Sequence, residues 1–502
     1  MLVPGLQSAI AQEPAARSGA AEGVERLASQ RPNILFICVD DLRPELGCYG
    51  VPHVESPNLD RLAAKGMRFT NHFVQVPSCG QSRYVLLTGR SPKSSGAMAI
   101  TAMYQGESQL LQTNTPAAQT MPELFRRSGY HTVCIGKVSH TPDGKVFAYN
   151  GSGDGRPEMP NAWDELPTRY GPWKRGWGTF FAYVGGRHRE DGQGHRDVME
   201  FVAESDEELP DGMMAAQAIE KLEQLKARRE RDDQPFFLGL GFFKPHLPFV
   251  ATKADWEAVA DVHVPPPPQP GKPNSKTWHR SGEFYQYEGP FPMSNPLADE
   301  DIIGGRRAYL ACVRFVDRQI GKVLDALDET GLADSTIVVV WGDHGWQIGD
   351  SAIWGKACLL ERSLRSTLII RAPGVTREGA ECNALVETLD IYPTLLELAK
   401  PQVTETLHPL NGTSMVPLLT GEAPSIRDAA ISYWRNGVSV RTDTHRFITM
   451  PTANGPPHTE LYDIRESPDP FEDIASRQPE LRDQMLQIIA DRHAELSHGN
   501  QQ

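Results

Sequence analysis

Cys79 and Arg83 stand four residues apart in the run Cys79-Gly80-Gln81-Ser82-Arg83, which reads as a strand-to-helix turn. A thiol that could attack and a guanidinium that could clamp an anion would then share one local scaffold. A lone cysteine is usually a small buried hydrophobe. A catalytic interpretation of Cys79 therefore depends on what the rest of the chain supplies.

Two apolar runs, residues 34–39 and 336–341, lead directly into acidic residues. Uninterrupted apolar runs suit central parallel strands that are covered on both faces. Open α/β sheets bind ligands at the carboxyl ends of such strands, and like charges packed there are costly unless a cation compensates them. The sequence therefore predicts a divalent-cation site built from Asp40, Asp41, Asp343 and His344.

The donor types narrow the choice of metal. An Asp-Asp pair alone is more often a helix cap or a turn, but its occurrence together with a second pair favours a metal site. Carboxylate oxygens favour calcium or magnesium, with calcium first, whereas the softer donor His344 keeps manganese and zinc open.

Basic residues follow three further segments. Residues 129–136 and 235–243 read as strands, and Trp354-Gly355 forms the third segment. A single surface lysine or histidine is usually solvated or structural, but repeated placement at strand ends favours a functional cationic set. Its members are Lys137, His140, Lys244, His246 and Lys356.

Taken together, these stretches resemble the sulfatase family of the alkaline phosphatase superfamily, and most of all its iduronate-2-sulfatase-like members. The resemblance spreads over most of residues 31–470, in the family's order. The stretches that carry it are Arg31-Pro32-Asn33 through Pro44, Leu46 to Gly50, Ser56 to Asp60, Cys79 to Arg90, Gly136 to Val138 with His140, Lys244 to Phe249, Asp343 to Trp346, and Trp354 to Lys356.

The resemblance implies a role for each matching position. Cys79 would be oxidised to formylglycine, whose hydrated gem-diol attacks sulfur, and the metal ligands would be Asp40, Asp41, Cys79 (as formylglycine), Asp343 and His344. Arg83 and Lys137 would steady the aldehyde hydrate. His246 and Lys356 would contact the sulfate and help protonate the leaving alcohol, and His140 would take the proton that lets the aldehyde re-form. This division of roles agrees with electrostatic stabilisation of the charge that develops on the transferring group.

Gln81 departs from the family pattern, which has proline or alanine two positions after the cysteine. The resemblance implies maturation by a formylglycine-generating enzyme. If that enzyme rejects glutamine, two alternatives arise. One is a phosphoester or phosphonate hydrolase with the same cationic layout, and the other is a catalytically silent protein that binds sulfated glycan or metal.

Composition disfavours a nucleic-acid partner. The chain has 502 residues and a formal net charge of −14, with a pI near 5.6, so a phosphate backbone would be repelled. An acidic exterior would also repel a long polyanion. We therefore expect a sulfated small molecule or the chain end of a sulfated saccharide as substrate, as in the degradation of glycosaminoglycans or other sulfated polysaccharides.

Strand runs alternate with helical patterns, which predicts an α/β fold with a large, mostly parallel sheet sandwiched by helices. Predicted helices cover Pro57 to Lys65, a short stretch opened by a capping box of Thr120 and Glu123, and Arg306 to Glu329. The expected catalytic domain spans residues 31–425. A smaller C-terminal α+β domain, residues 426–502, is expected to hold short antiparallel strands at 438–441, 446–448 and 460–463 and a helix from Pro479 to Leu496.

Two stretches look irregular, residues 141–210 and 262–297. Long loops within a compact domain are usually functional, so they are candidates for substrate selection. Trp346, beside the metal pair, is a candidate wall of the pocket.

The cysteines and the N-terminal residues indicate where in or outside the cell the protein is expected to act. The seven cysteines show neither metal-type pair spacing nor a convincing disulfide framework. No apolar run is long enough to span a bilayer. Residues 1–30 are expected to comprise the remainder of an export signal, with Ala9-Ile10-Ala11 as a cleavage triplet, and a flexible leader from residue 13. An exported, periplasmic or secreted location follows as an expectation.

Overall fold

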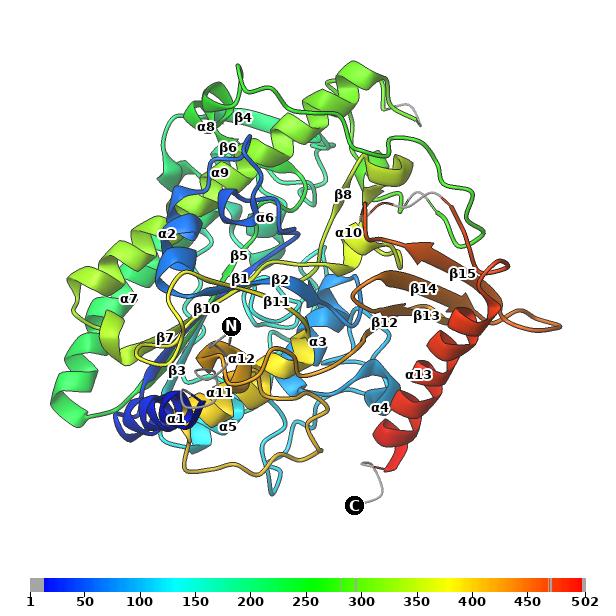
Figure 1. Cartoon of the computed structure of the whole chain (residues 1–502). Coiled ribbons are helices and arrows are strands. Elements are labelled where there is room, and N and C mark those ends of the chain that lie inside the picture. The colour runs from blue at the N-terminus through cyan, green and yellow to red at the C-terminus, as the bar shows by residue number, and fades with distance from the viewer. Residues whose placement is uncertain (1–12, 280, 294–295, 468, 470–471, 499–502) are drawn as a thin grey trace, which may run out of the picture.

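The computed structural model describes residues 13–279, 281–293, 296–467, 469 and 472–498 (Figure 1). Its centre is a seven-stranded sheet in the order β11-β2-β10-β7-β1-β5-β3. The strands are β1 (Asn33–Val39), β2 (Met67–Phe73), β3 (His131–Gly136), β5 (Phe236–Phe242), β7 (Thr336–Gly342), β10 (Leu368–Arg371) and β11 (Ala380–Glu387). Neighbouring strands run parallel except around β10, which is antiparallel to both β7 and β2. The predicted mostly parallel sheet is confirmed.

Helices cover both faces of this sheet. The helices of the described part of the chain are α1 (Glu13–Ser29), α2 (Pro57–Lys65), α3 (Cys79–Thr88), α4 (Pro92–Ser95), α5 (Met121–Arg127), α6 (Gly176–Phe180), α7 (Pro210–Asp232), α8 (Lys253–Ala258), α9 (Asp299–Glu329), α10 (Glu361–Leu364), α11 (Ile391–Ala399), α12 (Val416–Thr420) and α13 (Pro479–His498). Leu35 and Ile37 of β1 pack with α2, α7 and α9, whereas Ile34 and Phe36 pack with α3, α5 and α11. Because both faces of β1 are buried, its sequence is apolar without alternation. Figure 1 shows α7 and α9 together on one side of the sheet.

The predicted helix bounds hold to different degrees. Pro57 to Lys65 matches α2, but α9 begins at Asp299, seven residues before the predicted Arg306. Its first turn is acidic, which favours a helix N-terminus. The predicted capping box at Thr120 is wrong, because the Thr120 side chain forms no hydrogen bond to the first turn of the helix. The carboxylate of Glu123 instead accepts a hydrogen bond from the Gln119 N–H (2.8 Å) and binds Arg127.

A four-stranded antiparallel sheet lies near the C-terminus, in the order β12-β13-β14-β15. Its strands are β12 (Ala430–Trp434), β13 (Gly437–Arg441), β14 (His445–Met450) and β15 (His458–Asp463). Helix α13 packs along this sheet (Figure 1) through buried Met485 and Ile489. Only β12 lacked a sequence prediction. Ser432 of β12 donates a hydrogen bond to the Val74 carbonyl (2.7 Å), so the small sheet is tied to the large one. The domain boundary near residue 426 stays a prediction.

The N-terminal expectation needs one correction. Residues 13–29 form helix α1 where a flexible leader was expected, and Val24 and Leu27 are buried against the core. The helix forms because these apolar residues, three positions apart, give it a face that packs against α11. The export-signal prediction for residues 1–12 lies outside the described residues. Within the described ranges, no helix is both long and apolar enough to cross a membrane.

The two irregular stretches contain mostly turns and short elements. The first holds α6 and β4 (Met199–Ala203), and β4 pairs with β6 (Phe249–Thr252). The second has a single short turn of helix among its described residues, Phe284–Gln286. A separate pair, β8 (Gln347–Ile348) and β9 (Trp354–Gly355), forms a small hairpin-like ribbon after β7.

Candidate active site at the strand ends

Parallel pairing of β1, β3, β5 and β7 brings their carboxyl ends to one edge of the sheet. Asp40 and Asp41 follow β1, Asp343 follows β7, and Lys137 follows β3. His246 lies four residues beyond the end of β5. The sheet topology therefore gathers the residues that the sequence placed at strand ends.

Cys79 is the first residue of α3 and lies among these strand-end residues, with only 3% of its surface exposed. Its Sγ lies 3.4 Å from Asp40 Oδ1, 3.3 Å from His344 Nε2 and 3.4 Å from Lys356 Nζ. Burial, reinforced by Asp40, raises the pKa of the Cys79 thiol well above its usual value. The unmodified side chain is therefore held as a neutral thiol, a poor nucleophile.

Close packing of the α3 N-terminus against the loop at Ile100 holds Cys79 in this position. A Cβ at the next residue, Gly80, would lie 1.9 Å from the Ile100 carbonyl oxygen. Only glycine permits this approach of the α3 N-terminus to the neighbouring loop. Gln81 is also buried, and its amide donates to the Met98 carbonyl (2.9 Å). Gln81 thus lies within the first turn of α3 and contacts the loop without contacting the thiol.

The acidic residues form a fully buried cluster. The Asp41 N–H donates to Asp343 Oδ1 (3.0 Å), and Asp41 adopts a left-handed backbone with φ of 61°, a conformation that aspartate tolerates better than most residues. Asp41 Oδ2 is buried without a hydrogen-bond partner among the described residues. Burial, reinforced by Asp40, raises the pKa of Asp41 to about 7. A cation at this position would supply the missing partner and stabilise the carboxylate.

Two overlapping sets of side chains have the geometry to hold a metal ion. Within each set the donor atoms lie within 4.8 Å of one another. One set is Asp40, Asp41, Cys79 and His246, and the other is Asp40, Cys79, Asp343 and His344. Every side chain of the predicted cation site occurs in one of them. Half of the donors in each set are carboxylate oxygens, the ligands that a hard divalent cation such as Ca²⁺ or Mg²⁺ prefers.

Arg83 and Lys137 neutralise the acidic cluster from the other side. Arg83 is fully buried and contacts Asp343 Oδ2 through Nε and Nη2, at 3.0 Å each. Lys137 Nζ pairs with Asp40 Oδ2 and lies 4.0 Å from the centre of the Phe180 ring. Burial alone would raise the pKa of Asp40, but Lys137, His246 and Arg83 together hold that pKa well below its usual range. Asp40 therefore remains charged.

His246 and Lys356 both lie beside Glu283, a residue that the sequence did not mark. Glu283 lies 3.1 Å from His246 Nε2 and 3.4 Å from Lys356 Nζ. Lys356 also donates to Asp41 Oδ1 (2.9 Å). Glu283 belongs to the irregular 262–297 stretch, where no periodicity or motif marks it. Lys244, in contrast, donates to the carbonyls of His246 (2.9 Å) and Pro248 (2.6 Å) and so shapes the turn that carries His246.

His140 lies near the charges of Lys137 and Arg83. No hydrogen bond between His140 and Cys79 occurs among the described residues. Its backbone N–H donates to Glu158 Oε1 (3.2 Å), its ring faces Trp177 at 5.5 Å, and its buried Nδ1 has no described partner. Burial, with Lys137 and Arg83, lowers the pKa of His140 well below its usual value. The imidazole is therefore neutral and free to accept a proton at neutral pH.

Aromatic side chains from the 141–210 stretch surround the histidines. Phe180 lies 4.6 Å and Phe181 6.3 Å from the His246 ring, between ring centres. Tyr149 packs edge-on against Trp177 (4.5 Å) and remains 43% exposed. The guanidinium of Arg189 lies 3.5 Å over the Phe181 ring. Trp346, the candidate wall, is fully buried and lies 5.8 Å from Lys356 Nζ.

Comparisons with known proteins identify the family of this chain. The model of the family described as sulfatase matches residues 32–401. A second model, described as N-sulphoglucosamine sulphohydrolase, C-terminal, matches residues 342–501. A sulfatase of Formosa agariphila is 30% identical over 466 residues, which cover 87% of this chain and 82% of that protein. The iduronate 2-sulfatase of Mus musculus is 32% identical over 419 residues, 76% of this chain and 71% of that protein.

Solved structures share the fold at lower identity. The phosphonate monoester hydrolase of Agrobacterium radiobacter aligns with a TM-score of 0.72 at 20% identity, covering 93% of this chain and 96% of that one. A protein solved in complex with its substrate D-glucosamine-2-N,6-O-disulfate aligns with a TM-score of 0.68 at 20% identity, covering 94% and 99%. With the family model spanning most of its length, this chain belongs to the sulfatase family of the alkaline phosphatase superfamily.

Proposed function

We propose that the protein is a metal-dependent sulfatase that hydrolyses the sulfate ester of a sugar through a formylglycine made from Cys79. One observation carries the proposal. The Cys79 side chain lies within 3.4 Å of a metal-type carboxylate, a metal-type histidine and a lysine at the same time. A buried structural cysteine has no need of such neighbours, because it packs as a small hydrophobe.

The thiol itself suits the chemistry poorly, which supports a modified side chain. With its pKa raised by burial, Cys79 would not ionise at neutral pH. Hydrated formylglycine offers one hydroxyl to attack sulfur and a second to release the sulfate, with no need for a thiolate. Maturation would require a formylglycine-generating enzyme that accepts Gln81. In the folded chain the side chain of Gln81 bonds to Met98, so glutamine does not distort the site.

A divalent cation, most consistent with Ca²⁺, would be held by Asp40, Asp41, Asp343 and His344 together with the residue at 79. Bound there, it would supply Lewis-acid stabilisation of developing negative charge. Asp41 provides the clearest fit, since its Oδ2 is buried and lacks a described partner. The remaining steps fall to the side chains of the chain itself.

Each cationic residue has a position that suits a distinct task. Arg83 and Lys137, fixed by Asp343 and Asp40, would orient residue 79. Lys356 Nζ and His246 Nε2 point to a common carboxylate, that of Glu283, and a sulfate group in its place would be bound by both. Lys356, which stays protonated, would together with His246 help to protonate the leaving alcohol oxygen.

His140 is suited to accept a proton. Its pKa is lowered by burial and by Lys137, so the ring stays neutral, and Nδ1 is unpartnered among the described residues. We assign it the role of the base that takes a proton from the hydroxyl of residue 79 when sulfate is released.

The surroundings favour a saccharide as the organic part of the substrate. Exposed Tyr149, packed on Trp177, together with Phe181 and Arg189, offers an aromatic and cationic wall beside His140 and His246. Such walls suit a sugar ring that carries an additional anionic group. Relatives named iduronate 2-sulfatase and N-acetylglucosamine-6-O-sulfatase support the same class.

Matched assays on an aryl sulfate, an aryl phosphate and a phosphonate monoester test the proposal. The purified, matured protein should turn over the aryl sulfate with the highest kcat/KM, and sulfated mono- or disaccharides should be better substrates still. Preference for the phosphonate or phosphate ester would overturn the proposal in favour of the phosphonate hydrolase alternative. Turnover of none of them, with retained binding of sulfated sugar, would favour the silent glycan-binding alternative.

Replacing Lys356 with methionine should lower kcat/KM for the aryl sulfate by about 10²- to 10³-fold, because a fixed donor aimed at the reacting group is lost. Steady-state kinetics measures the effect. Lys253→Met is the matched control, since the Lys253 side chain is 53% exposed and pairs with Glu204, not with a residue around Cys79. Equal rates for the two variants would remove Lys356 from the sulfate-binding role.

Neutralising Glu283 should tighten sulfate binding. Its carboxylate engages His246 and Lys356, the two donors that a sulfate would use, and like charges facing each other oppose binding. In Glu283→Gln, inorganic sulfate should therefore inhibit at a concentration lower by about tenfold, a difference of about 1.4 kcal/mol. Glu288→Gln, an exposed glutamate of the same stretch, should leave inhibition unchanged. Weaker inhibition in Glu283→Gln would show that Glu283 assists binding instead.

A further inference from the structure

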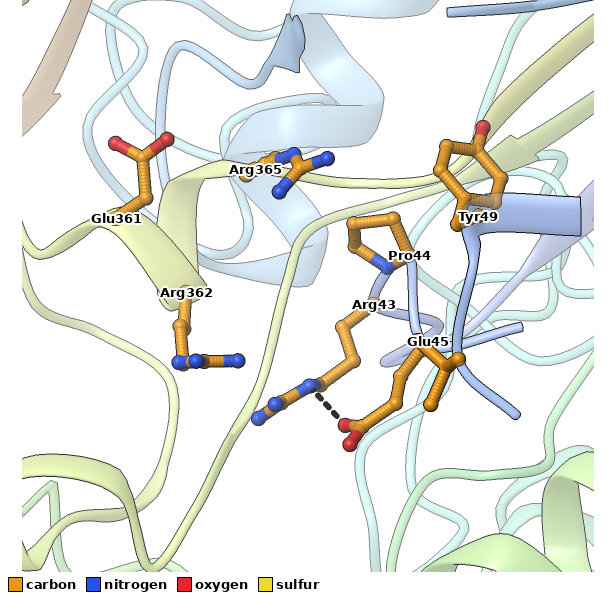
Figure 2. Close-up of a pocket in the computed structure, with 8 residues that line it drawn as sticks. Arg43, Pro44, Glu45, Tyr49, Glu361, Arg362 and Arg365 are labelled. Atoms are coloured by element: carbon orange, nitrogen blue, oxygen red, sulfur yellow. Dashed lines mark ion pairs between the residues drawn. The ribbon is translucent and has the colours of Figure 1, made fainter. Parts of the chain in front are cut away.

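A second pocket lies between the segment that follows β1 and helix α10, with a volume of about 200 Å³. Figure 2 shows the side chains that surround it, with Arg43 joined to Glu45. The residues that line it are Arg43, Pro44, Glu45, Tyr49, Val51, Glu361, Arg362 and Arg365. None of them belongs to the proposed catalytic set, and none has a described hydrogen bond or ion pair with Cys79. Three arginines around one opening make the pocket a candidate anion site.

The carboxylates at this pocket are already paired with other arginines. Glu361 binds Arg446 and Arg441 of the small C-terminal sheet, the latter at 3.2 Å. In Figure 2 its carboxylate points away from Arg362. Glu45 binds Arg43 at 2.6 Å and Arg306 at 3.3 Å. Neither glutamate forms a described ion pair with Arg365, and Glu361 acts on it only from a distance.

The wider network has more arginines than carboxylates. Asp350 lies 2.6 Å from Arg43 and 3.3 Å from Arg362, and Asp469 binds Arg362. The ion pairs form two separate groups. In one, Arg43, Arg306 and Arg362 face Glu45, Asp350 and Asp469, and in the other, Arg441 and Arg446 face Glu361 alone; with Arg365 added, six arginines face four carboxylates. The arginines are Arg43, Arg306, Arg362, Arg365, Arg441 and Arg446, and the carboxylates are Glu45, Asp350, Glu361 and Asp469. The excess positive charge remains uncompensated within the described part of the chain.

Arg365 is the arginine of this pocket that lacks an ion-pair partner among the described residues. Its Nε donates to the Thr70 carbonyl (2.6 Å), but no carboxylate of a described residue lies within 4 Å of its guanidinium. Burial lowers the pKa of Arg365, and Glu361 and Tyr49 offset this effect only in part. Arg365 is half-buried, and a charge taken partly out of water without an ion-pair partner is costly, so an anion at this position would stabilise the folded chain.

We propose that this pocket binds a tetrahedral oxyanion of the sulfate or phosphate type, held chiefly by Arg365 with Arg43 and Arg362 beside it. Guanidinium groups present paired N–H donors that match the oxygens of such anions. A volume of 200 Å³ holds about seven waters at roughly 30 Å³ each, so an oxyanion fits together with part of its hydration. The proposal goes beyond the proposed catalytic function and stands independently of it.

The same pocket is connected to the catalytic residues through Arg43. Arg43 Nη1 donates to the Trp346 carbonyl (2.9 Å), two residues after His344, and its N–H donates to Tyr309 Oη (3.1 Å). Tyr309 in turn donates to the Asp41 carbonyl (2.8 Å). An anion held by Arg43 and Arg365 would therefore stiffen the segments that carry Asp41 and His344.

Calorimetric titration with sodium sulfate, and separately with sodium phosphate, tests the proposal in the Lys356→Met background, where the catalytic anion site is weakened. One oxyanion should still bind, and Arg365→Gln added to that background should reduce its affinity at least tenfold. Arg371→Gln is the matched control, because Arg371 already pairs with Asp334 and should leave binding unchanged. Arg365→Gln alone should retain aryl sulfate turnover.

Two results would overturn the proposal: equal sulfate affinity with and without Arg365, or equal affinity for chloride and both oxyanions. If Arg365→Gln does not fold, crystals of the unaltered chain grown with selenate provide the second measurement. An anomalous peak among Arg43, Arg362 and Arg365 is expected. A selenate peak only beside Lys356 and His246 would overturn the proposal as well.

Discussion

Alanine at position 79 should abolish hydrolysis of an aryl sulfate, lowering kcat by at least about 10⁴-fold, because the attacking group is removed while the surrounding cations remain. The fold should survive, since Cys79 contributes a small side chain at the start of α3. Steady-state and single-turnover assays on the purified variant measure the loss, and circular dichroism checks the fold.

Cys382→Ala is the matched control for this loss. Cys382 is also a buried, unpaired cysteine, but it lies in β11 and forms no contact with the aspartate cluster. Its substitution should leave kcat within a factor of about two, as for a change that does not touch the reacting atoms. Retained sulfate hydrolysis in Cys79→Ala would remove residue 79 as the nucleophile.

Removing the divalent cation should have the second largest effect. Treatment with a chelator should lower kcat by at least about 10³-fold, because the developing charge loses its Lewis acid. The three carboxylates Asp40, Asp41 and Asp343 are buried beside one another, so the melting temperature should fall as well. A ligand present at 100 times its Kd stabilises a fold by about 2.7 kcal/mol.

Adding back single cations distinguishes the metals. Ca²⁺ should restore both activity and melting temperature, and Mg²⁺, Mn²⁺ and Zn²⁺ serve as the comparison. Asp41→Asn should raise the concentration of cation that is needed, since Asp41 supplies the buried oxygen without a described partner. Full activity after exhaustive chelation, with no metal found by elemental analysis, would contradict a metal-dependent site.

The sequence could predict the positions at strand ends because the topology of parallel sheets is strongly constrained. Once residues 34–39 and 336–341 read as buried parallel strands, Asp40 and Asp343 had to meet at one edge. Cys79 was predicted from its neighbours and the family resemblance, and the structure places it against Asp40 and His344.

Features set by tertiary contacts escaped prediction. Glu283 reaches His246 from an irregular stretch whose path is fixed by long-range packing, so no local pattern marks it. Helix α1 looked like a leader because its composition is rich in alanine, glutamate and glycine, and only packing against α11 explains its order. The unpaired state of Arg365 likewise depends on which arginines reach Glu361 from the distant β13 and β14.

Mass spectrometry of the tryptic peptide that spans residues 69–83 tests the central claim most directly. Cleavage after Arg68 and Arg83 isolates Cys79 as the single cysteine of that peptide. Protein purified from a source that carries a formylglycine-generating enzyme should yield a peptide lighter than the cysteine form, reactive toward hydrazide and inert toward iodoacetamide. An active enzyme whose peptide contains only alkylatable cysteine would contradict the account.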